Sequence, residues 1–261
     1  MRQKREPSVT VAYTILCFGA ITFTMSIVYT ASIPAFIGLG LTFWGALLLF
    51  IKPKKYVQFS LLNSIAISSL ETIDRIIGGL GYAGKAVYLP PKYSEMLEKA
   101  IVFVPFDKNV VIPPLKRVAE GETRVLPMLT MNPKGIFLRP PGLRLTNLYE
   151  RELGKDFTKV DLLYLHQNLP QLFVEDLEMA DDLQMTIEGN LIQVRITGSV
   201  FKDFCSEAMK LSHICGSIGC HLCSSIAIAL TRASGKPITI EETDVSEDRK
   251  VIEVHYKILE E

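Results

Sequence analysis

Two long apolar runs open the chain. Ser8–Tyr29 and Ile33–Ile51 contain no charged residue, and only Thr30–Ser32 lies between them. Each run has about 20 residues, which is the length that a helix needs to cross the hydrocarbon core of a bilayer. A helix also satisfies its own backbone hydrogen bonds inside lipid. The pattern therefore predicts a transmembrane helical hairpin over residues 1–55, embedded in the membrane lipid bilayer.

Basic residues lie at the two outer ends of this hairpin, and the connector between the runs has none. They are Arg2, Lys4, Arg5, Lys52, Lys54 and Lys55. Because cytoplasmic flanks are enriched in lysine and arginine, we expect a two-pass protein of the cell membrane with both termini in the cytoplasm. A cleaved signal peptide is the alternative for the first run. It is disfavoured because the run is longer than a signal core and a second run follows directly.

After the hairpin, the apolar residues change to helical spacing. Between Tyr56 and Leu80 they recur on one face, with polar residues between them, and Gly78-Gly79 follows as a stop signal. This spacing predicts an amphipathic connecting helix within residues 56–84. The helix either packs on the soluble domain or on a second copy, or lies on the membrane surface. The mixed charge of its polar face favours packing.

Residues 85–180 are rich in proline and show only short periodic stretches. Strands are predicted at Lys85–Leu89, Ile101–Phe106 and Gly135–Arg139, each stopped by a proline. Helices are predicted at Tyr93–Lys99, Leu143–Leu153, Thr158–Gln167 and from Pro170 to about Met179. Asp107–Glu122 has the composition of a loop. We therefore expect a β-containing and helical middle region.

Residues 181–261 show the clearest patterning. Apolar and polar residues alternate over Leu183–Glu188 and again over Ile192–Thr197, on either side of Gly189-Asn190, which predicts a β-hairpin. Ser199 is the expected cap of a helix, and Ser217–Ala233 is expected to form a second, buried helix. Alternation around Ile240 and Val254 predicts a closing hairpin. The predicted order is β-β-α-α-β-β, an α+β fold with an antiparallel sheet and helices on one face.

Composition bears on the kind of partner to expect and on whether the cysteines form disulfides. The chain has 261 residues with 28 lysines and arginines against 28 aspartates and glutamates, so no positive excess favours a nucleic acid as partner. There are 5 cysteines. An odd number in an intracellular domain predicts free thiols rather than a disulfide framework.

A cluster of cysteine and histidine is the first candidate for chemistry. His213, Cys215, Cys220 and Cys223 lie within eleven positions of one another. Thiolate and imidazole ligands suit zinc or an iron–sulfur cluster, although the spacing is not that of a standard site. The preferred alternative is tight packing of one helix through a stripe of small residues at helical spacing, namely Gly216, Cys220, Cys223 and Ala227. A third alternative is that Cys220 contacts a small ligand.

Arginines around an Arg-Pro-Pro-Gly turn are the second candidate. Arg139 and Arg144, with Lys134 nearby, could bind a phosphate or a lipid headgroup, and the alternative is a rigid turn with solvated cations. The sequence has no Walker loop, no G-x-G-x-x-G after a strand, no G-x-S-x-G and no H-E-x-x-H. No catalytic residue is assigned, and this absence disfavours a familiar hydrolase, nucleotide-binding enzyme or protease.

Two stretches carry a resemblance. Gly135–Gly142 with Tyr149–Gly154, and Gly219–Pro237, resemble an uncharacterised archaeal family with two membrane helices and a cytoplasmic domain of unknown function. The resemblance covers most of the chain and implies topology, without catalytic residues. A looser similarity at the level of fold, in the last helix and hairpin, links the chain to vinyl-reductase-type small-ligand-binding domains.

Three functions follow from these patterns. The favoured one is a membrane-anchored cytoplasmic module that binds a protein partner or assembles into a homo-oligomer. The second is a domain that senses a small ligand or a metal with the cysteine-rich helix. The third is an enzyme of unfamiliar type on a membrane-associated substrate. The third would gain support if Arg139 and Arg144 converged with an acid such as Glu150 in one cleft.

Overall fold

The computed structural model of the chain describes residues 7–29, 32–50, 59–81, 84–93, 101–107, 112–113, 124–126 and 129–260. The chain divides into two compact units, Met1–Gln58 and Phe59–Glu261. The first unit contains the predicted hairpin. The second contains the described strands.

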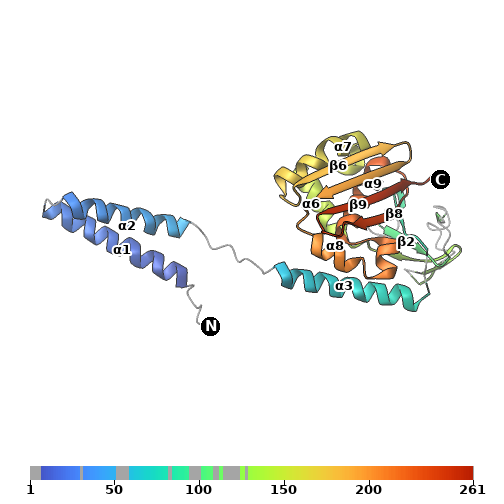
Figure 1. The fold of residues 1–261 in the computed structure, drawn as a ribbon, viewed down its shortest axis with the longest axis horizontal. Coiled ribbons are helices and arrows are strands. Elements are labelled where there is room, and N and C mark those ends of the chain that lie inside the picture. The colour runs from blue at the N-terminus through green and yellow to red at the C-terminus, as the bar shows by residue number, and fades with distance from the viewer. Residues whose placement is uncertain are drawn as a thin grey trace. The chain divides into compact units, whose positions relative to one another are not determined.

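The first unit consists of two helices that run side by side, α1 (Pro7–Val28) and α2 (Ser32–Phe50) (Figure 1). A Cβ atom on Gly38 would lie 2.5 Å from the backbone nitrogen of Phe23, and one on Gly45 would lie 2.6 Å from that of Leu16. Only glycine lets the two backbones approach this closely. Such contacts between small residues are the usual way in which membrane helices pack.

Both helices are long and apolar enough to cross a membrane. Large apolar side chains such as Phe18 and Phe36 are exposed on the hairpin, which suits hydrocarbon better than water. The prediction of two membrane-compatible helices at the N-terminus is therefore confirmed. A third segment, Ile214–Ser234, also has sufficient length and apolar composition, but most of it is buried inside the second unit.

The second unit is built on one antiparallel sheet, which has nine strands in the described part of the chain. The strands are β1 (Val87–Leu89), β2 (Ile101–Pro105), β3 (Arg124–Leu126), β4 (Leu129–Met131), β5 (Lys134–Leu138), β6 (Asp182–Glu188), β7 (Leu191–Thr197), β8 (Ile238–Val245) and β9 (Val251–Ile258). Their order across the sheet is β3-β4-β5-β2-β1-β8-β9-β7-β6. Because β1 pairs with both β2 and β8, the short middle strands and the C-terminal hairpins form a continuous sheet.

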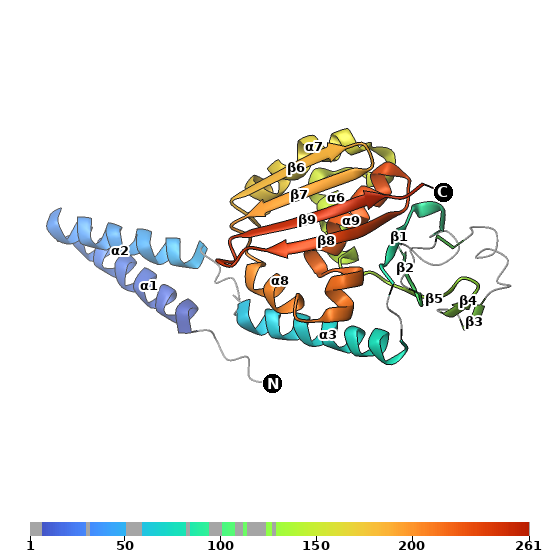
Figure 2. The same cartoon turned by 45° about the vertical axis from the view of Figure 1, so that its right-hand side comes forward.

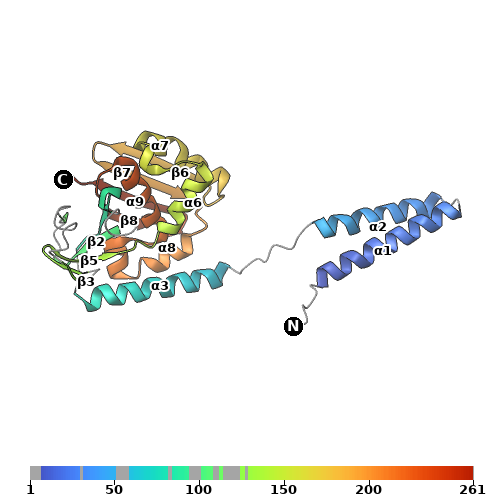
Figure 3. The ribbon, with the colours of Figure 1, turned by 180° about the vertical axis from the view of Figure 1, so that it is seen from behind.

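Helices pack on one face of the long strands. They are α3 (Phe59–Gly79), α6 (Leu143–Leu153), α7 (Leu162–Gln171), α8 (Lys202–Ala208) and α9 (His221–Ser234), with a 3-10 turn η1 (Phe157–Lys159) and two π-helical turns, η2 (Leu172–Asp176) and η3 (Ile214–Ile218). Figure 2 shows β6, β7, β9 and β8 side by side with α6 and α9 behind them, and Figure 3 shows the helical face. Residues Leu222–Thr231 of α9 are all buried, so this helix forms the centre of the core. The predicted α+β class with an antiparallel sheet is confirmed.

The predicted helix Ser217–Ala233 is wrong at its start. Gly219 has a φ of 76°, in the left-handed region that favours glycine, and it separates η3 from α9. Cys220 then becomes the N-terminal cap residue of α9. Gly216 therefore lies outside the helix and is exposed, so the predicted stripe of small residues does not run down one helix.

Three smaller predictions also need correction or fall outside the described residues. Ser199 does not cap α8, which begins at Lys202; its hydroxyl accepts a hydrogen bond from the Phe201 nitrogen in a turn instead. Pro170 does not open a helix but lies inside α7. Most of Tyr93–Lys99 and of the loop Asp107–Glu122 lies outside the described residues.

Candidate ligand-binding cleft

A cleft with a volume of about 620 Å³ opens between β1, α6, η1 and α9. This volume lies in the usual range of small-molecule sites. The cleft is lined by Tyr88, Leu89, Pro91, Arg139, Leu143, Arg144, Asn147, Glu150, Asp156, Thr158, Ile228, Thr231 and Arg232. Arg139, Arg144 and Glu150, which lie on a loop and a helix after β5, therefore share one cleft, as the enzyme hypothesis required.

The N-terminal end of α6 is fixed against α9 at Gly142. A Cβ atom on Gly142 would lie 2.1 Å from the backbone nitrogen of Ser225, so only glycine fits. The Gly142 nitrogen donates to Ser224 Oγ at 3.1 Å, and the Thr146 hydroxyl donates to the Ser225 carbonyl at 2.8 Å. The Tyr149 hydroxyl lies 3.0 Å from Ser225 Oγ. This buried network holds the two helices that form the cleft in one register.

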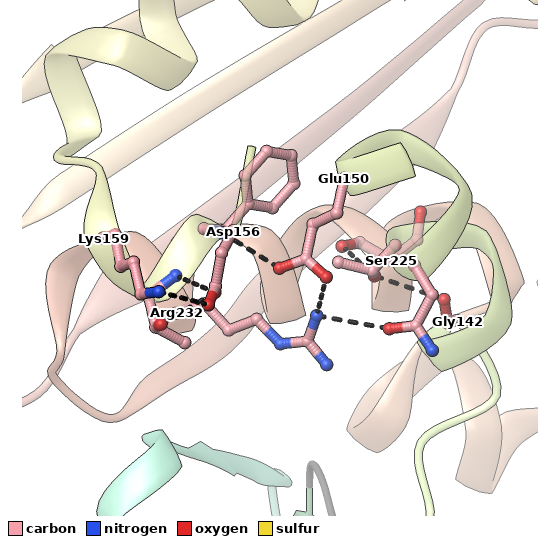
Figure 4. Close-up of polar contacts among 10 residues, drawn as sticks. Gly142, Glu150, Asp156, Lys159, Ser225 and Arg232 are labelled. Carbon is pink, nitrogen blue, oxygen red and sulfur yellow. Dashed lines mark hydrogen bonds and ion pairs between the residues drawn. The ribbon is translucent and has the colours of Figure 1, made fainter. Parts of the chain in front are cut away.

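An ion pair between Glu150 and Arg232 spans the floor of the cleft (Figure 4). Arg232 Nη1 donates to Glu150 Oε2 at 2.7 Å and to Asn147 Oδ1 at 3.2 Å. The other Glu150 oxygen accepts a hydrogen bond from the Phe157 nitrogen at 3.0 Å. Both side chains are largely buried, with 14% exposure for Arg232 and 20% for Glu150. Since both carboxylate oxygens are engaged, Glu150 links α6, η1 and α9 rather than offering an open proton acceptor.

Asp156 forms the rim of the cleft and caps η1. Its Oδ1 accepts hydrogen bonds from the Thr158 hydroxyl at 2.7 Å and from the Thr158 nitrogen at 3.0 Å. These bonds, chiefly the one from the hydroxyl, lower the pKa of the Asp156 carboxyl. Asp156 is therefore a carboxylate at neutral pH, and its position is set by the turn.

The charge of the cleft favours an anion. Three arginines and two carboxylates line it, which leaves one net positive charge. Arg232 is paired with Glu150. Arg139 and Arg144 are both exposed and are separated along the chain by the Pro140-Pro141-Gly142 turn. Guanidinium groups recognise phosphate and carboxylate groups through paired N–H donors, so two arginines that flank one turn are suited to bind such an anion.

The cysteines gather away from this cleft, in the core. Cys205 Sγ lies 3.4 Å from Cys220 Sγ, and Cys223 Sγ lies 3.6 Å from Cys220 Sγ. These three are buried and, together with Cys215, line a cavity of only about 10 Å³, room for about one water molecule. A small ligand beside Cys220, as one hypothesis required, therefore has no space in this structure.

Cys220 is the thiol whose protonation is most strongly perturbed. The hydrogen bond with the Cys205 thiol is the largest cause, followed by the contact with the Cys223 thiol and by the backbone N–H groups of Cys223 and Leu222. Together they hold the pKa of Cys220 well below its usual range. The same interactions with Cys220 raise the pKa of Cys205 and Cys223. A thiolate at the N-terminus of α9 is also stabilised by the helix dipole.

The metal hypothesis gains no geometric support. Among the residues that the structure describes, no group of three or more histidine, cysteine, aspartate or glutamate side chains is arranged to hold a metal ion. His213 packs elsewhere, because a Cβ atom on Gly78 of α3 would lie 2.6 Å from His213 Nε2. The hypothesis of zinc or an iron–sulfur cluster at His213, Cys215, Cys220 and Cys223 remains a prediction from the sequence.

Sequence reasoning found Arg139 and Arg144 but missed several residues of the cleft. Arg232 was not predicted as a site residue, because it lies near the end of a segment whose apolar composition predicts a buried helix. Its signal was available: it is the charged residue within the otherwise uncharged stretch Gly219–Gly235. Charges are rarely buried without a partner, so Arg232 required an acid nearby.

Comparison with known proteins gives the family but no activity. A protein-family model described as domain of unknown function DUF7982 matches residues 1–257. No curated protein and no solved structure matches the chain. Because the match covers nearly the whole chain, this protein belongs to that family of unknown function.

Proposed function

We propose that this chain is a membrane-anchored protein whose domain, residues 59–261, binds an anionic small ligand in the cleft between α6 and α9. The observation that carries the proposal is the placement of Arg139 and Arg144 in a cleft of about 620 Å³ with one net positive charge. The ligand class is a phosphate monoester or a carboxylate, because those anions match the guanidinium group.

The cleft is built in a way that suits binding. Its floor is fixed by the Glu150–Arg232 ion pair and by the hydrogen bonds between α6 and α9. The backbone positions of Arg139 and Arg144, which flank the Pro140-Pro141-Gly142 turn, are thereby fixed before the ligand arrives, and less backbone entropy is lost on binding. Asp156 and Thr158, which hydrogen-bond to each other, also line the cleft and add polar groups to its wall.

The orientation in the membrane is part of the proposal. The basic residues that flank the two spans, at positions 2–5 and 52–55, favour a cytoplasmic location for both ends of the chain and hence for the domain. A cytoplasmic cleft would meet phosphorylated metabolites and the headgroups of the inner leaflet.

Protein binding or self-assembly is a second candidate. It is favoured by β6, which lies at one end of the strand order and thus has an edge that another strand could pair with. Crosslinking in native membranes tests it. Recovery of a dimer or of a single crosslinked neighbour supports it, and recovery of monomer alone contradicts it.

Binding of glycerol 3-phosphate to the full chain tests the main proposal. The chain is reconstituted in phosphatidylcholine nanodiscs, and binding is followed by titration calorimetry with glycerol as the uncharged control. We expect saturable binding of glycerol 3-phosphate only. Arg139→Gln and Arg144→Gln should each weaken it about tenfold, the effect of losing one hydrogen bond to a charged group.

The matched control is Arg195→Gln. Arg195 is exposed on β7 among residues that alternate with the buried Val194 and Ile196, so it lies on the sheet face away from the cleft. This variant should bind as the parent does. The proposal fails if glycerol 3-phosphate does not bind, or if Arg195→Gln weakens binding as much as Arg144→Gln.

A further inference from the structure

A second hollow lies on the other side of α6, and it is apolar. It has a volume of about 460 Å³ and runs between α3, α6 and α8. Its wall includes Leu62 of α3, Leu145 and Leu148 of α6, and Phe201 beside α8. We refer to it as the apolar groove.

Arg144 lies at the boundary between the apolar groove and the cleft, and it lines both. On α6, Leu143, Asn147 and Glu150 face the cleft at helical spacing, whereas Leu145 and Leu148 face the groove. Helix α6 therefore separates the charged cleft on one side from the apolar groove on the other. An arginine placed between them is positioned for a ligand that has both an anionic and an apolar part.

Two buried polar atoms in the groove lack a hydrogen-bond partner among the described residues. They are Asn63 Oδ1 and His221 Nδ1. Buried polar atoms are nearly always paired, so an unpaired one calls for an explanation such as a ligand. The His221 ring is fixed edge-on against Phe204, with the ring centroids 5.3 Å apart. The groove wall therefore has polar groups beside its apolar residues, which suits a ligand with a polar and an apolar part.

We propose that the apolar groove and the cleft together form a binding site for an anionic lipid, with its phosphate at Arg144 and an acyl chain along α6. This inference rests on the proposed function and names the ligand class. A lipid is favoured over a soluble amphiphile because the same chain carries two helices fit to span a membrane.

Photocrosslinking in nanodiscs tests this proposal on the full chain. The probe is phosphatidic acid with a diazirine in one acyl chain, diluted into phosphatidylcholine. After illumination, mass spectrometry compares adducts on the groove residues of α3 and α6 with adducts on α1 and α2, which serve as the internal standard. We expect groove adducts that unlabelled phosphatidic acid displaces. Arg144→Gln should lower their ratio to the hairpin adducts about tenfold, whereas Arg195→Gln should not.

The outcomes separate this proposal from the proposed function. Adducts confined to α1 and α2 overturn the lipid site even if glycerol 3-phosphate binds normally, which leaves a soluble ligand in the cleft. Equal groove labelling by diazirine phosphatidylcholine, unaffected by Arg144→Gln, also overturns it. Absence of groove adducts from either lipid, together with a dimer in the crosslinking of native membranes, would show that a second copy of the chain covers the groove instead. Leu148→Glu, which places a charge in the groove, should abolish the groove adducts while glycerol 3-phosphate still binds.

Discussion

The carboxylate of Glu150 and the guanidinium of Arg232 meet at 2.7 Å between α6 and α9, with most of both side chains shielded from water. Glu150 Oε1 is also the acceptor for the Phe157 nitrogen, so one carboxylate connects three elements around the cleft. This pair therefore has a structural role that can be separated from ligand binding by Arg139 and Arg144.

Removing one member of the pair should destabilise the domain by about 2 kcal/mol, less than the 3–5 kcal/mol of a fully buried pair because some solvent reaches it. Glu150→Gln is the suitable change, because the amide oxygen can still accept from Phe157. The expected loss of melting temperature is about 4–8 °C. In the double variant, which combines Glu150→Gln and Arg232→Gln, the loss of melting temperature should be smaller than the sum of the losses in the two single variants. Additive losses, measured by thermal unfolding of the full chain in detergent, would contradict coupling.

Gly142 gives a second prediction about the same helix contact. In Gly142→Ala the new methyl group would meet the Ser225 backbone at 2.1 Å, and backbone cannot move aside as a flexible side chain can. We expect a loss of about 2–3 kcal/mol and weaker binding of glycerol 3-phosphate, since Arg144 moves with α6.

Gly79→Ala is the matched control for this change. A Cβ atom on Gly79, near the end of α3, would meet no atom within 4 Å. The substitution should be neutral or should stabilise the helix by about 0.5–1 kcal/mol. If both alanine variants melt at the temperature of the parent, the close approach of α6 and α9 at Gly142 is not present in the protein.

The membrane helices and the C-terminal strands could be predicted because each has a pattern of its own. The uncharged runs gave α1 and α2, and the alternation across Gly189-Asn190 gave β6 and β7. These signals are local, because the spacing of apolar residues within one short segment shows which face of that segment is buried.

The pairing of β1 with β8 could not be predicted, because it joins residues about 150 positions apart. The short strands β3 and β4 were missed since three residues carry too little periodicity. The cleft was foreseen only in part. Arg139 and Arg144 can be recognised in the sequence because they lie beside the prolines. That they share a cleft with Glu150 and Arg232 depends on how α6 packs on α9, and the close contact of Gly142 with Ser225 fixes that packing.

His221 should make the domain sensitive to mild acid. Burial lowers the pKa of its imidazole below the ordinary value of 6.5. The unfolded chain therefore takes up a proton before the folded one does, so stability declines as pH falls below about 6.5. His221→Gln should melt at a temperature that depends less on pH between 7 and about 5. His166→Gln, at an exposed position on α7, is the control and should keep the pH dependence of the parent. The reverse result for the two variants would place the titrating group elsewhere.

The cysteine cluster leads to a prediction about thiolate chemistry. The pKa of Cys220 lies well below its usual range chiefly because the Cys205 thiol donates to it. The ultraviolet thiolate absorbance of the folded chain should therefore begin at a lower pH than that of an ordinary thiol, and this early rise should disappear in Cys220→Ala. Cys205→Ala removes the main donor, so this absorbance should appear only at a higher pH. Cys17→Ala, in α1, is the control because Cys17 is exposed and belongs to the other unit. If that early rise survives Cys220→Ala, another thiol carries the charge, and the cluster at the start of α9 is then three neutral thiols that only fill the core.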